Sequence, residues 1–485
     1  MKKLELAKLL LVSAVLAAPA AAQDLNSLPS VSEIVRLAKA GGISGPAPAA
    51  VPAPRAVKDW TVMVFMNGKN NLSEYVIKDM NEMEKLGPTD NINIITQAAR
   101  INYQAPSYPG GGYNDYPDVY PGGVVPHPGW PNPYWGGGMP PMMMKDAGVT
   151  RDASTDWAGV RRYEVVKDGD NAALSSRLIA DLGSVDMGDY RQLVEFGKWA
   201  KANYPARHYM LIVWNHGSGW EMKGLDLFPV IKGISYDDET GHGINPVDLA
   251  AALRGMGGVD IYASDACLMQ MAEVAYELRD AAKVIVGSEE TEPGDGWAYD
   301  YFLARVHSNK GNLTPDVMAA AAVQGYKAYY AEQKDSVTQS ALHTSGLAQF
   351  RVLLDQWVQL VMKEDKAMVK QALSSATSFS GAGSRDLIHF LENVHAGTKS
   401  PALKAQTAAV MKQLYDKVIF DNGATGDKFK KAYGLGVYLP GWSFDQEYGK
   451  LAWARDGKWD ELVQWLTAKD ETPAPNTHAQ EAEAR

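Results

Sequence analysis

The sequence predicts an α/β fold built around a mostly parallel sheet. Short apolar runs rich in β-branched residues lie at 60–66, 92–98 and 209–214, and segments with helical spacing lie between such runs. Parallel strands must be joined by long crossovers, usually helices, and this alternation fits that requirement. Continuous apolar runs are also typical of strands covered on both faces.

The predicted elements alternate along the chain, with one interruption. Residues 103–150, rich in Gly, Pro, Tyr and Met, cannot form regular elements and indicate a long surface insertion. Beyond residue 305 helical segments dominate. The individual predictions are a strand at 60–66, a helix at 72–86, a strand at 92–98, a helix at 189–203, a strand at 209–214, a helix at 245–256, a strand at 259–264, a helix at 268–282, a strand at 283–287, a strand-like segment at 433–440 and a last helix at 458–468.

The composition is that of a globular protein with an acidic surface. The chain is 46% hydrophobic, enough for a large core, and its net charge is -10. No basic run is long enough to follow a phosphate backbone, so we expect no nucleic-acid partner. The expected organisation is a signal peptide at 1–22, an Ala/Pro-rich pro-segment or linker at 23–58, an α/β domain at 59–305 that contains the insertion, a mainly helical region with a late strand at 306–468 and a disordered tail at 469–485.

The N-terminal segment is typical of a bacterial secretory signal. Lys2 and Lys3 precede an apolar run from Leu9 to Ala18 that is too short to span a bilayer. We therefore expect an exported protein, periplasmic or extracellular, without a membrane span. Because Cys267 is the single cysteine, no disulfide can form within the chain, and its stability must come from packing.

Two predicted strands end in side chains capable of catalysis. His216 follows the strand that ends at Trp214, and Cys267 follows the strand that ends at Ser264. Because the carboxyl ends of parallel strands line one edge of a sheet, we expect His216 and Cys267 to be neighbours. An imidazole beside a thiol can take its proton and create a nucleophile. The pattern predicts a Cys-His dyad for acyl transfer.

The residues around this dyad would complete its chemistry. A helix beginning at Leu268 would place its N-terminus beside the sulfur and favour the thiolate. The backbone N–H groups of Gly217 and Cys267 would hold a developing oxyanion. The alternatives are a core histidine before a glycine turn and a buried, inert cysteine. A metal site is a weaker interpretation, because thiolate ligands normally occur in sets and no HExxH motif is present.

Two aspartates are expected at the same edge of the sheet. Asp265 precedes Cys267 by two residues, and Asp295 lies in the loop after the strand at 283–287. Carboxylates there would favour a cationic side chain of a substrate, best an arginine held by two hydrogen bonds. The alternative is that either aspartate only caps a turn.

At these residues the chain resembles the clostripain family of cysteine peptidases. The resemblance covers residues 59–440 and rests on WTVMVFMNGKNNL, DMGDYRQLVEFGKWAKANYPARHYMLIVWNHGSGW, ISYDDETGHGI and VDIYASDACLMQMAEVAYELRDAAKVIVGSEETEPGDGW. It implies a caspase-like three-layer α/β sandwich and a secreted thiol endopeptidase that cleaves proteins or peptides after Arg or Lys. It also implies His216 as general base, Cys267 as nucleophile, Gly217 and Cys267 as oxyanion hole, and Asp265 and Asp295 in the P1 pocket.

The resemblance implies two further features. The first is self-cleavage between the His and Cys motifs, for which Lys223, Lys232 and Arg254 are the candidates, with Lys232 in the most loop-like context. The second is calcium dependence, for which the acidic turn Asp237, Asp238 and Glu239 is the candidate, a solvated loop being the alternative. No cofactor is required by the chemistry. The Pro/Gly/Tyr-rich insertion departs from the family's usual pattern.

Two other functions use the same sequence features. One is a secreted binding protein, non-catalytic or only self-processing, that holds a partner through the insertion and the helical C-terminal region. The other is a transpeptidase or ligase that passes the acyl group from the dyad to an amine. The intact pair of His216 and Cys267 argues against the first, while the products would distinguish the second.

Overall fold

The computed structural model describes residues 55–101, 155–169, 173–220, 233–381 and 383–469, all within one compact unit. The predicted signal peptide, nearly all of the pro-segment, the insertion at 103–150, the tail beyond residue 469, Lys223 and Lys232 lie outside the described residues.

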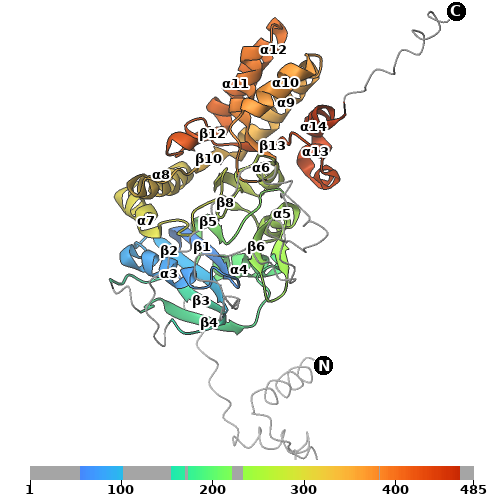
Figure 1. The fold of residues 1–485 in the computed structure, drawn as a ribbon. Helices are drawn as coiled ribbons and strands as arrows, with labels where there is room; N and C mark the ends of the chain where they lie inside the picture. The colour runs from blue at the N-terminus through green and yellow to red at the C-terminus, as the bar shows by residue number, and fades with distance from the viewer. Residues whose placement is uncertain (1–54, 102–154, 170–172, 221–232, 382, 470–485) are drawn as a thin grey trace, which may run out of the picture. The chain divides into compact units, whose positions relative to one another are not determined.

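A twisted sheet of nine strands runs through the described unit (Figure 1). Five central strands are parallel, in the order β2, β1, β5, β8 and β9, and two antiparallel strands extend each side. Across the sheet the strands are β12 (Ile419–Asn422), β10 (Ser340–His343), β9 (Ala282–Gly287), β8 (Val259–Asp265), β5 (Ala206–Trp214), β1 (Lys58–Gly68), β2 (Ile92–Arg100), β3 (Gly159–Glu164) and β4 (Arg177–Gly183). Two small antiparallel sheets pair β6 (Ile234–Asp237) with β7 (His242–Ile244), and β11 (Ser384–Asp386) with β13 (Gly436–Tyr438).

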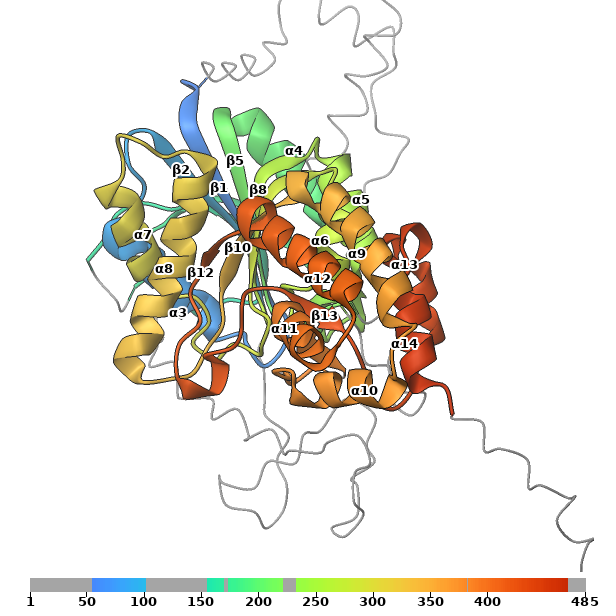
Figure 2. The ribbon, with the colours of Figure 1, turned by 90° about the horizontal axis from the view of Figure 1, so that it is seen from above.

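Helices cover both faces of the sheet, as Figure 2 shows from above. One face carries α3 (Tyr75–Leu86), α7 (Tyr299–Ser308) and α8 (Pro315–Gln333). The other carries α4 (Tyr190–Asn203), α5 (Pro246–Gly255) and α6 (Ala272–Leu278). The C-terminal helices are α9 (Leu347–Val361), α10 (Lys366–Ser375), α11 (Leu387–Gly397), α12 (Pro401–Gln413), α13 (Ala452–Asp456) and α14 (Trp459–Thr467), with single 3-10 or π turns at η2 (Thr344–Gly346), η3 (Leu414–Val418), η4 (Asp427–Phe429) and η5 (Gln446–Lys450).

The central strand β1 shows why its sequence is apolar throughout. Alternate side chains of a strand point to opposite faces. Met63 and Phe65 enter the core beneath α4, α5 and α6, whereas Val62 and Val64 enter the core beneath α3, α7 and α8. The predicted α/β fold with a mostly parallel sheet is confirmed, and it is a three-layer sandwich.

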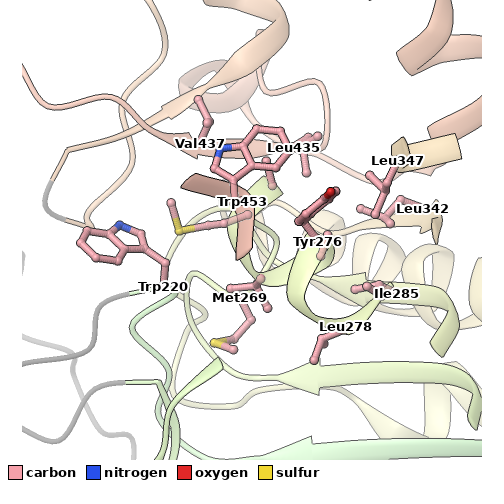
Figure 3. Close-up of a cluster of buried hydrophobic side chains, with 14 of the residues drawn as sticks. Trp220, Met269, Tyr276, Leu278, Ile285, Leu342, Leu347, Leu435, Val437 and Trp453 are labelled. Atoms are coloured by element: carbon pink, nitrogen blue, oxygen red, sulfur yellow. The ribbon is translucent and has the colours of Figure 1, made fainter. Parts of the chain in front are cut away.

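The C-terminal region shares its core with the sheet. Strands β10 and β12, both from this region, continue the sheet beyond β9. Figure 3 shows Tyr276 of α6 gathered with Leu342 of β10, Val437 of β13 and Trp453 of α13, and all four belong to one buried cluster. The helices after β10 are thus packed on the face of the sheet that carries α6, whereas α8 covers the other face.

One predicted element is wrong where it concerns the site. The helix expected from Leu268 begins only at Ala272, and Leu268 has a left-handed backbone with φ 63°. The Leu268 N–H donates a hydrogen bond to the Glu290 carbonyl at 3.1 Å, and the Gln270 N–H donates to the Ser288 carbonyl at 2.9 Å. These bonds hold residues 267–271 against the loop after β9, so Cys267 does not lie at the N-terminus of a helix.

Candidate active site

The ends of β5 and β8 bring the histidine and cysteine segments together. Trp214 of β5 pairs with Asp265 of β8, and the N–H of Asn215 donates to the Asp265 carbonyl at 3.2 Å. Just beyond, Gly217 lies so close to Cys267 that a Cβ on the glycine would stand 2.3 Å from the cysteine carbonyl oxygen. No larger residue fits there without a shift, so the glycine is what permits the two segments to meet.

His216 is half-buried, and its ring is fixed by two neighbours. Its Nε2 lies 2.7 Å from Oδ1 of Asn71, which follows β1. Its ring lies against that of Tyr236, with centroids 6.2 Å apart. Burial lowers the pKa of His216 to about 4, because the packed surroundings penalise the imidazolium. The imidazole is therefore neutral near pH 7 and able to accept a proton.

Cys267 is also half-buried, and its sulfur contacts the loop after β9. The Glu292 N–H donates to Sγ over 3.3 Å, and Sγ lies 4.0 Å from the Glu292 carbonyl oxygen. Cys267 packs against an apolar cluster that includes Leu268, Phe379 and Phe429. Burial, and then the nearby Glu292 carboxyl, raise the pKa of the Cys267 thiol to about 12. The resting site thus holds a neutral thiol and a neutral imidazole.

The backbone around the two residues leaves donors available for an oxyanion. Within the described residues, the N–H groups of Gly217 and Cys267 donate to no other residue, although those of Ser218 and Leu268 next to them do. Unpaired N–H groups at the ends of adjacent strands are the donors that acyl-transfer sites use.

Asp265 lies behind Cys267 and is buried. Its carboxylate accepts hydrogen bonds from the Trp297 N–H at 3.1 Å and the Tyr299 hydroxyl at 2.9 Å. Burial raises the pKa of Asp265 to about 6, against the opposing effect of these donors and of Lys78. The Glu292 carboxyl is hydrogen-bonded to Asp265, and burial together with the Asp265 charge raises the pKa of Glu292 as well. The two carboxyls therefore form a pair that retains a proton more readily than free carboxyls do.

Asp295 lies near this pair and has a cationic partner of its own. Its carboxylate accepts from the Tyr329 hydroxyl at 3.1 Å and lies 3.7 Å from Lys78 Nζ. Lys78, on α3, also lies 3.5 Å from Asp79 and 3.0 Å from Glu82. Burial alone would lower the pKa of Lys78, but these three carboxylates outweigh it and raise that pKa. The two predicted P1 aspartates thus belong to a cluster of carboxylates that contains one internal ammonium, that of Lys78.

The acidic turn considered for calcium has contacts within the chain. Asp237 accepts from the N–H groups of Met187 and Glu239, at 2.9 and 3.0 Å. The buried ammonium of Lys69 lies 3.5 Å from Asp237 and 2.6 Å from Glu239. Burial raises the pKa of Asp238 to about 6, with the Asp237 charge adding to the effect. Among the described residues no group of three or more His, Cys, Asp or Glu side chains is arranged to hold a metal.

Sequence reasoning missed three residues of the site. Asn71 lies in the quoted segment WTVMVFMNGKNNL, and Glu292 lies in EETEPGDGW, but neither has a signature that separates it from a turn residue. The position of Lys78 could have been inferred from the sequence, because it adjoins Asp79 and precedes Glu82 by one turn in a helix whose packing buries both acids.

Of the processing candidates, Arg254 is exposed in the last turn of α5.

The comparisons with known proteins agree with this geometry. The model of the clostripain family matches residues 64–465, so the chain is a cysteine peptidase by class. It belongs to the clostripain family. Clostripain of Hathewaya histolytica is 23% identical over 360 residues, which cover 57% of this chain and 67% of that protein.

Two solved structures share the fold. A secreted C11 cysteine protease from Bacteroides thetaiotaomicron, in complex with an irreversible peptide inhibitor, has a TM-score of 0.54 and 18% identity, over 84% of this chain and 99% of that chain. An inactive zymogen C11 protease from Parabacteroides distasonis has a TM-score of 0.53 and 17% identity, over 85% and 99%. The fold is therefore caspase-like, as predicted. No helix in the described ranges has the length and apolar character needed to cross a bilayer.

Proposed function

We propose that the chain is an exported cysteine endopeptidase that cleaves peptide bonds after Arg, or Lys, through Cys267 and His216. The observation that supports this most directly is the contact of Gly217 with the Cys267 carbonyl at the ends of β5 and β8. This contact places the one thiol of the chain and a neutral imidazole on adjacent segments. The backbone N–H groups of Gly217 and Cys267, on the same segments, are the donors for an oxyanion.

The reaction begins with proton transfer from Cys267 to His216 as the sulfur attacks the substrate carbonyl carbon. The carbonyl oxygen becomes an oxyanion that accepts from the N–H groups of Gly217 and Cys267. The His216 imidazolium gives its proton to the leaving nitrogen, the C–N bond breaks, and a thioester on Cys267 remains. Water then attacks this thioester, His216 takes its proton, and the carboxylic acid product leaves with the thiol restored. Apart from the substrate and one water molecule, these steps use the groups of Cys267, His216 and Gly217.

The preference for a cationic P1 side chain follows from the carboxylates near the sulfur. Asp265 and Asp295 are assigned to this pocket, and Glu292 adds a third carboxyl next to Cys267. Carboxylates in a partly dry pocket favour a guanidinium, which can pair with two of them at once. A neutral P1 side chain would gain no such charge pairing with these carboxyls, so we expect it to bind more weakly than a guanidinium.

Export and self-processing are part of the same proposal. The N-terminal signal pattern and the secreted relative from B. thetaiotaomicron support export. For self-cleavage, Lys223 and Lys232 are preferred to Arg254, because a peptidase binds an extended chain and Arg254 is part of α5. Calcium binding at Asp237, Asp238 and Glu239 stays a prediction, in competition with the Lys69 ion pairs.

The test compares the purified wild type with Cys267→Ala and His216→Ala on peptide amides with Arg, Lys or citrulline at P1. We expect the wild type to cleave the Arg and Lys peptides, and both variants to lose cleavage and self-processing while melting at the same temperature. Labelling of Cys267 by an arginyl ketone would identify the nucleophile. Activity that persists in Cys267→Ala contradicts the proposal.

The same assay separates the other two functions. A binding protein would give no turnover with any peptide and no labelling of Cys267, while a partner co-purifies. A transpeptidase would join the acyl group to an added amine in preference to water. We expect hydrolysis to dominate even with the amine present.

A further inference from the structure

The geometry points to Asn71 as a positioning residue that holds the His216 imidazole in one tautomer and one orientation. Asn71 Oδ1 faces His216 Nε2 at 2.7 Å. A carboxamide oxygen only accepts hydrogen bonds, so Nε2 carries the ring hydrogen and Nδ1 keeps its lone pair. Nδ1 is then the nitrogen that receives the proton of Cys267. This inference rests on the proposed role of His216 as general base.

The loop that carries Asn71 is built to keep the amide in place. Asn67 Oδ1 accepts from the Lys69 N–H at 3.1 Å, and Asn70 Oδ1 accepts from the Leu72 N–H at 2.9 Å. Such side-chain bonds to the following backbone fix tight turns. Asn71 therefore occupies a defined position at the carboxyl end of β1, directly beside β5.

The same loop is tied to the histidine segment from the other side. Asn215, which precedes His216, donates through its Nδ2 to the Asn67 carbonyl and accepts at Oδ1 from the Tyr236 N–H at 2.7 Å. Asn70 Nδ2 donates to the Tyr236 carbonyl at 2.9 Å. The residue before the base and the residue before its partner are thus held by one network, so the distance between Asn71 and His216 is fixed from both ends.

The neutral charge of this partner also suits the site. In the described part of the chain, Asn71 is the side chain that hydrogen-bonds the His216 ring, and no charged group contributes to the shift of the His216 pKa, which burial alone lowers. A carboxylate in this place would stabilise the imidazolium and, through it, a resting thiolate. An amide orients the ring without stabilising the imidazolium, which fits a resting site in which the Cys267 thiol and the His216 imidazole are both neutral.

The test uses three variants. Asn71→Leu has nearly the same shape but no acceptor, and Asn71→Asp keeps the acceptor and adds a charge. Asn203→Leu is the control, because within the described ranges that exposed amide, at the end of α4, bonds to the Trp199 carbonyl and to no group of the site. We expect Asn71→Leu to lower kcat by about 100-fold, the usual cost of a misplaced catalytic group, with KM unchanged. Asn203→Leu should match the wild type.

Asn71→Asp gives a readout that a merely structural role would not move. Its carboxylate should raise the pKa of His216, so the acid limb of kcat/KM should move to higher pH by about one unit or more. The same change should extend the alkylation of Cys267 by iodoacetamide to lower pH, because a thiolate paired with an imidazolium becomes favourable. If Asn71→Leu does not fold, the pH profiles of Asn71→Asp are sufficient to test the inference.

Two results would overturn the inference, and both can be told apart from failure of the proposed function. Wild-type kcat in Asn71→Leu, or unchanged acid limb and alkylation profile in Asn71→Asp, removes Asn71 from the mechanism while Cys267→Ala and His216→Ala stay inactive. Activity in those last two variants would instead remove the dyad itself.

Discussion

The ring of Trp220 meets the ring of Tyr448 edge to face, with centroids 4.9 Å apart and planes at 89°. Trp220 closes the segment that carries His216, whereas Tyr448 belongs to η5 in the C-terminal region. The Tyr448 hydroxyl in turn donates to the buried carboxylate of Glu273, on α6, at 2.6 Å. The C-terminal region therefore supports the histidine segment through an aromatic contact and a buried acid.

That buried acid predicts a stability that falls with rising pH. Burial raises the pKa of Glu273 from its ordinary 4.5 to about 7. A carboxyl whose pKa is raised by folding stabilises the fold below its unfolded pKa, and this stabilisation is lost as the pH rises through the folded value. Glu273→Gln should therefore be more stable than the wild type at pH 8, by up to about 3 kcal/mol, with the advantage gone near pH 4.

Urea unfolding at both pH values measures this difference. Glu461→Gln, an exposed acid on α14 paired with Lys458, is the control and should show no comparable dependence on pH. Equal stability of Glu273→Gln and the wild type at pH 8 would mean that Glu273 titrates normally.

The removal of the Lys78 charge is predicted to destabilise the fold strongly. Lys78→Met leaves Asp79, Glu82 and Asp295 without their ammonium, and breaking such a pair while burying the remaining charge costs about 3 kcal/mol. Lys78 stays charged throughout the acidic and neutral range, so its stabilisation persists there. In the variant the acids can protonate at low pH, so the loss should be smaller at pH 5 than at pH 8.

Lys85→Met is the matched control for Lys78→Met. Lys85 lies on the same helix and pairs with Asp300 at 2.9 Å, but its side chain is 39% exposed against 19% for Lys78. Its replacement should cost below about 1 kcal/mol. Thermal unfolding measures the stability of both variants. Similar losses of stability would show that the burial of Lys78 does not increase its contribution.

Asp265 predicts that the preference for a cationic P1 residue increases with pH. Its pKa of about 6 means that the pocket gains negative charge between about pH 5 and 7. The ratio of kcat/KM for an Arg peptide to that for its citrulline analogue cancels the titration of the dyad and should rise over this interval. In Asp265→Asn the ratio should be at least about 10-fold lower and nearly flat with pH. A flat ratio in the wild type would remove Asp265 from P1 recognition.

The close approach of Gly217 to Cys267 predicts that a larger residue at position 217 disrupts the site. In Gly217→Ala the new methyl would stand 2.3 Å from the Cys267 carbonyl oxygen and 3.1 Å from the Ala266 Cβ, so the two segments must separate. We expect a loss of about 1–3 kcal/mol in stability together with a loss of activity. Gly311→Ala is the control, since a Cβ there meets nothing within 4 Å. Full activity in Gly217→Ala would show that the close approach is dispensable.

The central sheet was predictable because its strands are apolar on both faces. Runs such as 60–66 and 209–214 are short and rich in β-branched residues, which favours a buried strand over a buried helix segment. Strands β3 and β4 at the edge could not be found in this way, since their half-exposed sequences GVRRYE and RLIADLG lack a continuous apolar pattern. The short strand β10 is specified by the edge of β9 that it covers, and β12 by the edge of β10.

The site was predictable only as far as strand ends determine it. Asn-His-Gly and Asp-Ala-Cys follow buried strands, and parallel pairing alone brings those segments together. The helix expected at Leu268 fails because the left-handed turn there redirects the chain toward the loop after β9. Asn71, Lys78 and Glu292 come from other elements and meet the site through tertiary packing, which single-sequence periodicity does not report.

The order of strands in the sheet has a consequence for a chain cut after His216 and before β8 begins at Val259. The N-terminal fragment would keep β1, β2 and β5, the C-terminal fragment would keep β8, β9 and β10, and the seam between β5 and β8 would lie in the interior. The two pieces would stay together as a non-covalent heterodimer, migrating as one species under native conditions and as two in detergent. The nucleophile and its base would then be contributed by different polypeptides.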